Sequence, residues 1–365
     1  MIKTKIFLIF LSIIFAVFLI TACNAPTGEV VKEEDRVVKF GVIASLTGEA
    51  AQWGEALKNG MIIAQKELAI KDTHFKYEFV IEDDQLQNAK TVSAFHKLNG
   101  VDKINALVSF SSGSGNAIAP LAEQNQVITC SVASDPAIVK DRKYVFKHWV
   151  TPEAEAEKYV EELDRRELKT VGMISTNQQG VLAVFLELEK RLGNRIVFNE
   201  VIDPDIKDFR TEITKLKQIN PDTLYTAMLP GQVTPLMRQL EEMNYQGDVS
   251  NIETFEYEEA AIPYLEGRWY INTAEEKGHF KEIYEAEYGE KPLVASGNAY
   301  DCIMLIVEAY EKAKTKNPDL VVRELHKIKD YEGALGTLYI DDENSVQSPA
   351  VVKEVRNGEF VVVRE

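Results

Sequence analysis

The sequence predicts an α/β protein of two doubly wound parallel-sheet lobes. Three observations lead to this prediction. From Lys39 onward, short apolar strands alternate with amphipathic helices, the pattern of a parallel sheet covered by helices. The same alternation starts again at Thr151. The chain has 365 residues, more than one hydrophobic core usually holds, so two lobes are expected.

The first 22 residues are predicted to be a signal peptide. Two lysines precede an unbroken apolar segment over 6–20, which is shorter than the roughly 20 residues of a membrane-spanning helix. The segment ends in "LITAC", which is similar to the bacterial lipobox and implies lipidation of Cys23. An ordinary signal peptide or an N-terminal anchor helix is the alternative. Residues 23–36 are polar and aperiodic, so we expect a flexible tether.

Composition restricts the partners. The signal peptide holds two of the 41 basic residues and no acidic one, so the mature chain has 39 basic against 58 acidic side chains. The resulting net charge of −19 argues against nucleic acid as a partner and fits a secreted protein. The five histidines are scattered, and no Cys/His cluster has metal-ligand spacing, so no metal or cofactor is expected. Cys130 and Cys302 lie in apolar segments and are expected to be buried free thiols, with a disulfide as the alternative.

Short hydrophobic patterns predict the strands and helices of the first alternating series. "KFGVIASL" and "YEFVIEDD" have strand patterns, and "WGEALKNGMIIAQKELA" has helical periodicity. In order, we expect strands over 39–46, 77–84, 105–110 and 126–132, with helices over 53–69, 88–98 and 116–125.

The second series begins with a helix, for which Thr151 is a suitable N-cap and Pro152 a suitable first helical residue. Helices over 151–166, 181–192, 208–218 and 233–243 alternate with strands over 170–176, 195–202, 223–229, 248–253 and 268–272. Three helices near 277–288, 296–314 and 318–329 follow, then a strand over 337–341. A hairpin over 351–363 closes the chain, and its Asn357-Gly358 predicts a type I′ turn.

The most informative turn is "SFSSGSGNAIAP", between a strand that ends at Phe110 and a helix expected from Gly115–Asn116. It has no lysine for a P-loop, and Ile118 stands where the dinucleotide fingerprint needs its third glycine. Glycines flank Ser114 directly, so the nucleophile elbow is also excluded. Hydroxyls followed by helix-start amides can instead bind a carboxylate that must later leave. A turn without any ligand is the alternative.

The chain resembles the type I periplasmic binding proteins of the branched-chain amino acid class. "SLTGEAAQWGEALKNG", "VSFSSGSGNAIAPLAEQNQVITCSVASDPAI" and "MRQLEEMNYQGDVSNIE" carry the resemblance, which extends over 37–365 in the order of elements. It implies that the lobes are joined by a hinge of crossovers. The first lobe would then hold 37–148 plus about 275–332, and the second lobe 149–274 plus about 333–365.

The resemblance also implies ligand-binding residues. The serine that takes the ligand carboxylate falls on Ser111, and the small and hydroxyl residues of the next loop fall on Ala133 and Ser134. The aromatic residue that packs on the ligand falls on Trp53, and the acidic residue that accepts the ammonium falls on Glu253. Serine caps, a buried tryptophan and a solvated glutamate are the respective structural alternatives.

The sequence departs from the family in the second lobe. Where relatives often have a tyrosine, "STNQQGVLA" has Gly180, with Gln178 and Gln179 nearby as further candidates for ligand contact. A second aromatic residue is missing around Leu229-Pro230. These differences leave the side-chain specificity for the ligand undetermined.

The resemblance implies a monomeric extracytoplasmic receptor, anchored to the membrane through Cys23, that captures an amino acid or related small carboxylate and delivers it to an ABC permease. No catalytic residue is expected, so the protein is not predicted to be an enzyme. A sensory receptor of the same fold is the first alternative. A secreted serine hydrolase is the second, and its nucleophile would be Ser111, Ser112 or Ser114.

Overall fold

The computed structural model describes residues 36–364, apart from the side chain of Tyr257. The predicted signal peptide, the predicted lipidation at Cys23 and the tether up to residue 35 lie outside the described residues.

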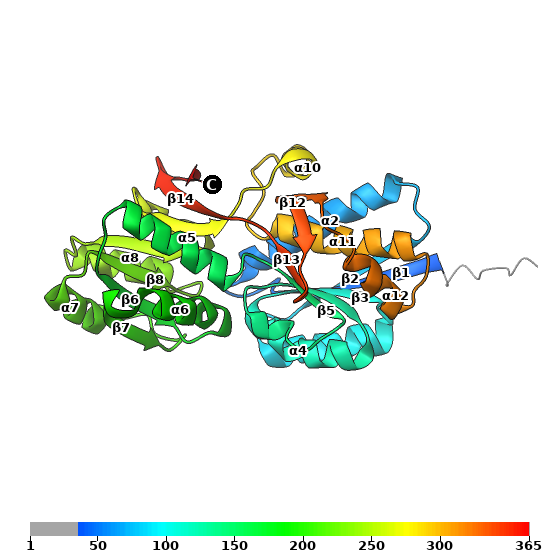
Figure 1. Ribbon diagram of the computed structural model, residues 1–365, viewed down its shortest axis with the longest axis horizontal. Helices are drawn as coiled ribbons and strands as arrows, with labels where there is room; N and C mark the ends of the chain where they lie inside the picture. Colours follow the sequence, from blue (N-terminus) through cyan, green and yellow to red (C-terminus); the bar gives the residue numbers. More distant parts are fainter. Residues whose placement is uncertain (1–35, 365) are drawn as a thin grey trace, which may run out of the picture. The chain divides into compact units, whose positions relative to one another are not determined.

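The first sheet has eight strands in the described part of the chain, in the order β11-β12-β13-β5-β4-β3-β1-β2 (Figure 1). The run β13-β5-β4-β3-β1 is parallel, whereas β11 and β12 pair antiparallel at one edge. The strands are β1 (Val37–Ala44), β2 (Lys76–Asp83), β3 (Ala106–Phe110), β4 (Ile128–Val132), β5 (Val145–His148), β11 (Tyr331–Gly333), β12 (Gly336–Ile340) and β13 (Ser345–Gln347).

Helices cover both faces of this sheet, because its central strands are apolar on both sides. In β3, Ala106 and Val108 join a core with α2, α11 and α12, whereas Leu107 joins a separate core with α3 and α4. Figure 1 shows α11 beside α2 although they are far apart in sequence. The helices are α2 (Ala51–Ile70), α3 (Asn88–Lys97), α4 (Ser112–Asn125), α10 (Gly278–Tyr288), α11 (Ser296–Ala313) and α12 (Pro318–Leu325).

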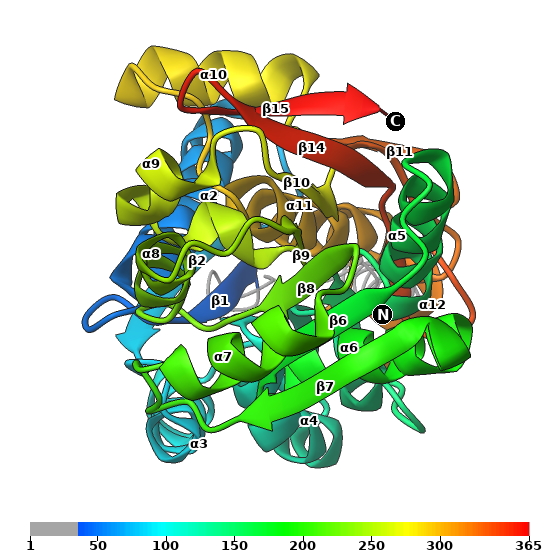
Figure 2. The same cartoon turned by 90° about the vertical axis from the view of Figure 1, so that its left-hand side faces the viewer.

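The second sheet has seven strands among the described residues, in the order β15-β14-β10-β9-β8-β6-β7, parallel from β10 to β7. Figure 2 shows α5 and α6 on one side of these strands and α7 and α8 on the other. The strands are β6 (Val171–Thr176), β7 (Ile196–Ile202), β8 (Thr223–Ala227), β9 (Asp248–Ile252), β10 (Trp269–Thr273), β14 (Ala350–Arg356) and β15 (Glu359–Arg364). The helices are α5 (Pro152–Arg165), α6 (Gln179–Leu192), α7 (Arg210–Ile219), α8 (Val233–Glu242) and α9 (Ile262–Leu265).

Local signals correctly predicted two boundaries. Thr151 caps α5, where its hydroxyl accepts a hydrogen bond from the Ala154 amide at 3.3 Å, and Pro152 is the first helical residue. Asn357 and Gly358 both have positive φ, 54° and 76°, as a type I′ turn requires, and they join β14 to β15.

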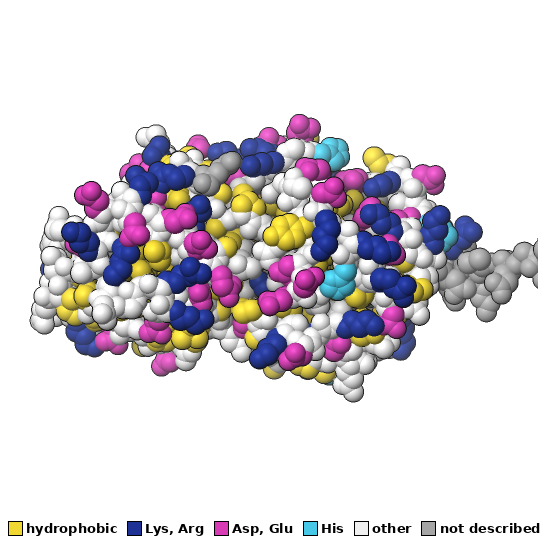
Figure 3. Space-filling view, in the orientation of Figure 1, with side chains coloured by type: hydrophobic (Ala, Val, Ile, Leu, Met, Phe, Trp, Pro, Cys, Tyr) yellow, Lys and Arg dark blue, Asp and Glu magenta, His cyan; other side chains and the backbone are white. Residues whose placement is uncertain are grey.

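Both sheets belong to one compact unit that starts at Val38. Within the described chain, the backbone passes between the sheets after β5, after β10 and after β13. The predicted fold class, two mainly parallel lobes joined by crossovers, is confirmed. On the face in Figure 3, acidic and basic side chains are interspersed.

Three details of the elements differ from the prediction. Helix α4 begins at Ser112 rather than near Asn116, because the small residues themselves adopt helical backbone. The short strands β5, β11 and β13 were not predicted, since three or four residues show no clear period. Strands β12 and β13 belong to the first sheet, whereas residues from 333 onward were expected in the second lobe. Only β14 and β15 join the second sheet.

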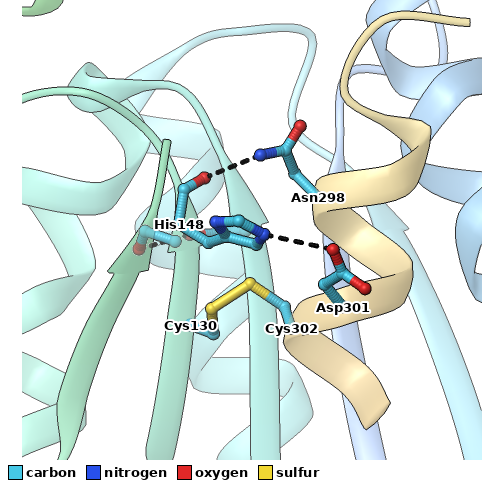
Figure 4. The surroundings of a disulfide bond; sticks show 7 residues. Cys130, His148, Asn298, Asp301 and Cys302 are labelled. Carbon is cyan, nitrogen blue, oxygen red and sulfur yellow. Dashed lines mark hydrogen bonds and ion pairs between the residues drawn. A yellow bond between two sulfur atoms is a disulfide. The ribbon is translucent and has the colours of Figure 1, made fainter. Parts of the chain in front are cut away.

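The expectation of free thiols is wrong: Cys130 in β4 and Cys302 in α11 form a disulfide, with a Cα–Cα distance of 5.7 Å (Figure 4). The two residues are 172 positions apart in sequence, but α11 packs on β4. Each cysteine lies on the buried apolar face of its element, and these two faces are in contact. Beside the disulfide, His148 lies 3.4 Å from Asp301. A disulfide is typical of an oxidising compartment outside the cytoplasm.

Candidate functional site

A cavity of about 60 Å³ lies where the carboxyl ends of strands from both sheets meet. Ligands of open parallel sheets bind at such strand ends, where helix N-termini also point. The first-lobe side of the cavity is formed by Trp53, Leu86, Phe110, Ser111, Ser112, Val132, Ala133 and Ser134, and the rest by Trp149, Gln178, Gly180, Val181, Leu229 and Glu253.

Ser111 occupies the N-cap of α4 in an unusual backbone conformation. Its φ of 75° and ψ of 150° lie in a region that is populated almost only by glycine, at a strain of about 1–3 kcal/mol for other residues. The Ser111 amide donates to the carbonyl of Val132 at 3.1 Å, and its hydroxyl accepts from the Ser114 amide at 3.2 Å. This conformation places the hydroxyl beside the first amides of α4, which have no acceptor within the helix.

The other serines of the turn have structural partners. Ser114 donates at 2.8 Å to the buried carboxylate of Asp84, which also accepts from Thr91 and Ser45. The hydroxyl of Ser112 lines the cavity and accepts a hydrogen bond from the Asp135 amide at 3.2 Å, which ties the turn to the next strand-end loop. Ser111 and Ser112 thus both line the cavity, whereas Ser114 does not.

The next loop completes the first-lobe wall. Ala133 and Ser134 follow β4 directly and are each 5% exposed. On the opposite side Trp53, at the start of α2, packs its ring 4.8 Å from that of Phe110. The wall thus combines the hydroxyl groups of three serines with an aromatic surface.

The second lobe brings the N-terminus of α6 against this wall. The Gln178 side-chain carbonyl caps the helix by accepting from the amides of Gly180 and Val181, at 2.8 and 3.2 Å. A Cβ atom on Gly180 would lie 2.7 Å from the Ser112 hydroxyl oxygen and 3.2 Å from that of Ser134. Such a close approach requires glycine at this position. Gln179 lies outside the lining and accepts a hydrogen bond from Asn116 of the first lobe, at 3.2 Å.

Glu253 supplies the acidic group of the cavity. It follows β9 with a φ of 64°, and its side chain is 8% exposed. The indole N–H of Trp149 donates to its Oε1 at 2.5 Å. A nearly dehydrated carboxylate held by a donor in this way can accept a further hydrogen bond from a cationic group.

Six of the seven residues predicted to contact a ligand line this cavity, namely Trp53, Ser111, Ala133, Ser134, Gln178 and Glu253. Gln179 does not. The clearest omission from the prediction is Trp149, which lies directly after β5. The sequence pattern does not reveal the short strand β5, so it gives no sign that Trp149 follows a strand end. Leu86, in the loop after β2, is a second lining residue that was not predicted.

Trp53 also borders a larger cavity of about 400 Å³, which is rich in glutamate. Two of its glutamates form ion pairs with lysines of the same cavity: Lys353 lies 2.8 Å from Glu256, and Lys291 lies 2.9 Å from Glu359. The smaller cavity is the better candidate for the ligand site because it combines strand ends with helix N-termini. Among residues 36–364, no group of His, Cys, Asp and Glu could hold a metal ion. No described helix is both long and apolar enough to span a membrane.

Comparison with known proteins agrees with this fold. The model of the periplasmic binding protein family matches residues 37–359. The Leu/Ile/Val-binding protein homolog 3 of Brucella melitensis is 24% identical over 331 residues, which cover 86% of this chain and 89% of that protein.

Two solved structures share the fold. The branched-chain amino acid transporter substrate binding protein LivJ of Streptococcus pneumoniae, in complex with isoleucine, matches with a TM-score of 0.82 at 21% identity, over 90% of this chain and all of the other. An ABC transporter solute binding protein of R. palustris, in complex with benzoate, matches with a TM-score of 0.80 at 16% identity, over 90% and 96% of the two chains.

The fold is that of the two-lobed binding proteins. The chain belongs to the periplasmic binding protein family, within which it is related to Leu/Ile/Val-binding proteins. The resemblance inferred from the sequence is therefore confirmed, and the family implies an extracytoplasmic location.

Proposed function

We propose that the protein captures a small α-amino acid in the cavity between the lobes and delivers it to an ABC permease. One observation carries the proposal: hydroxyl groups and the N-terminus of α4 face Glu253 across a cavity of about 60 Å³. The carboxylate of the ligand would accept from Ser111, Ser134 and the α4 amides. Its ammonium group would donate to Glu253. A zwitterion needs this arrangement of donors at one end and an acceptor at the other.

The size of the cavity supports a small ligand. About 60 Å³ has room for roughly four to six water-sized groups, and the head group of an amino acid has about five non-hydrogen atoms. The relatives differ in what they hold, since one solved structure contains isoleucine and another benzoate. Benzoate has no ammonium group that could donate to Glu253. We therefore expect amino acids to bind better than aromatic acids.

Capture would couple to closure of the two lobes. Only a ligand that touches Ser111 in one lobe and Glu253 in the other gains more affinity in the closed form, and this difference drives closure. Lipidation at Cys23 would hold the receptor at the membrane near its permease. The serines of the cavity have no histidine among the lining residues, which gives no support to a serine hydrolase.

The proposal is tested by melting shifts with L-leucine, L-isoleucine, L-valine, L-alanine, glycine, benzoate and 4-hydroxybenzoate. At a hundredfold excess over its Kd, a true ligand stabilises the protein by about 2.7 kcal/mol, a readily measured shift. We expect amino acids to raise the melting temperature and the aromatic acids not to. Shifts with the aromatic acids alone would contradict the proposed ligand class.

Glu253→Gln tests the ammonium site. Loss of a charge-assisted hydrogen bond of about 1.5–3 kcal/mol should weaken amino-acid binding about 10- to 100-fold, as measured by calorimetry. Glu259→Gln is the matched control, because it changes charge equally in the same β9–β10 connection but is exposed. Wild-type affinity in Glu253→Gln would show that Glu253 does not bind the ammonium.

A further inference from the structure

Behind the cavity lies a buried carboxyl group that no donor reaches. Glu155, in the first turn of α5, is fully buried, and in the described part of the chain no N–H or O–H group donates to either of its oxygens. An ionised carboxylate in such a place loses its hydration without compensation, which strongly disfavours the charged form. Glu155 therefore needs either a proton or a cation.

The carboxyl of Glu155 faces that of Glu253. Burial, followed by the negative charge of Glu253 and a hydrogen bond with it, raises the pKa of Glu155 well above its usual range. The two groups are not equivalent, because Glu253 lines the cavity and accepts from the Trp149 indole whereas Glu155 has no other donor. One proton between the two oxygens would satisfy both groups, with Glu155 as the neutral member.

Other groups around Glu155 do not replace this proton. Lys147 of β5 is buried and favours ionised Glu155, but its Nζ makes no hydrogen bond among the described residues. Glu153, two residues earlier on α5, adds further negative charge. The Tyr225 hydroxyl of β8, near both carboxyls, is also buried, and within residues 36–364 it donates to neither of them. The surroundings thus contain one lysine, whose pKa burial lowers, against three carboxyl groups.

We propose that Glu155 and Glu253 hold one proton between them while no cation occupies the cavity, and that a ligand ammonium bound at Glu253 displaces this proton. The O–H bond of Glu155 breaks, the proton passes to the buffer, and the ammonium supplies the positive charge in its place. The charge around the two glutamates does not change, because the ammonium takes the place of the proton. Glu155 is thus a positioning residue that acts through Glu253, and this inference rests on the proposed function.

Such an exchange makes the site selective for cations. A ligand without an ammonium group cannot replace the proton, so the carboxyl of Glu155 adds nothing to its affinity. The affinity for an amino acid should rise with pH over the range in which the pair holds its proton, by up to about tenfold per pH unit, since binding releases a proton. A neutral glutamine at position 155 would remove this dependence.

The test is calorimetry at neutral pH in two buffers that differ in ionisation enthalpy, with L-alanine, L-leucine, L-isoleucine and L-valine as probes. The difference in binding heat gives the number of protons released. We expect release of up to one proton by the wild type and none by Glu155→Gln, whose Kd should also be independent of pH. Glu153→Gln is the matched control, since it is exposed, lies in the same helical turn and should still release the proton.

The outcomes separate this inference from the proposed function. An amino acid that binds the wild type without proton release overturns the exchange but leaves the receptor function intact. If no probe binds, the proposed ligand class fails, and infrared spectra of the unliganded protein still test the shared proton. The wild type should then show a protonated carboxylic acid band that is lost in Glu155→Gln and kept in Glu153→Gln. Identical bands in wild type and Glu155→Gln overturn the inference whatever the ligand is.

Discussion

At the scale of single residues, the site uses backbone conformations that its side chains do not favour. Ser111 and Glu253, on opposite sides of the cavity, both have positive φ, 75° and 64°. Strain of this kind persists where surrounding structure enforces it, and it is concentrated at functional sites. Each strained residue directly follows a strand, so the strand ends aim both side chains at the same volume.

Ser111→Gly should change stability and binding in opposite directions. Glycine relieves the backbone strain, and replacing a serine N-cap by glycine lowers helix stability by only a few tenths of a kcal/mol. The free energy of unfolding should therefore rise by about 0.5–2 kcal/mol. Loss of the hydroxyl should weaken amino-acid binding about tenfold. Urea unfolding and calorimetry measure the two effects.

The control for this prediction is Gln126→Gly at the other end of α4, where φ is 56° and the side chain is exposed. It should raise stability without changing affinity. If Ser111→Gly kept wild-type affinity, the strain would have no connection with ligand binding.

At the scale of elements, two of the helix N-termini that line the cavity lie in direct contact with each other. Helix α4 presents Ser112, and α6 presents Gly180 so closely that no side chain fits between them. A hydrogen bond from Asn116 to Gln179 links the same two helices. The glycine that departs from the family pattern is therefore what allows the lobes to approach this far.

The disulfide between β4 and α11 should stabilise the first lobe. It closes a loop between positions 172 residues apart, and removal of a native disulfide typically costs about 2–4 kcal/mol. Reducing agent should lower the urea midpoint of the wild type accordingly. The double variant Cys130→Ala/Cys302→Ala should unfold near the reduced wild type and should not respond to reductant. A wild-type midpoint that is insensitive to reductant would contradict the bond.

At the scale of the whole molecule, the chain crosses between its two sheets three times within the described residues. Several parallel connections at one side of a cleft favour a hinge motion that opens and closes it. The ligand-binding residues come from both sides of these crossings, so closure and capture are one event in the proposed function. The disulfide and the family both agree with a location outside the cytoplasm.

Membrane attachment is predicted to depend on Cys23. Mass spectrometry of the mature protein from its host should find an N-terminus at Cys23 that carries lipid, and metabolic labelling with a fatty acid should label the wild type but not Cys23→Ala. The double variant Cys130→Ala/Cys302→Ala is the control and should keep the label, because its Cys23 is intact. An unmodified Cys23, or a mature N-terminus elsewhere, would show that the lipobox interpretation is wrong.

Most of the order of strands and helices, the two-lobe fold and six of the fourteen residues that line the cavity could be predicted from the sequence. Helical and strand periods are local, and the Ser111 turn and Glu253 occur in family patterns that are continuous in sequence. Tertiary structure alone decided the rest. Trp149 and Glu155 meet Glu253 across about a hundred residues, Cys130 meets Cys302 across 172, and β12 and β13 join the first sheet. No local period encodes these contacts, because each depends on how distant elements pack against one another.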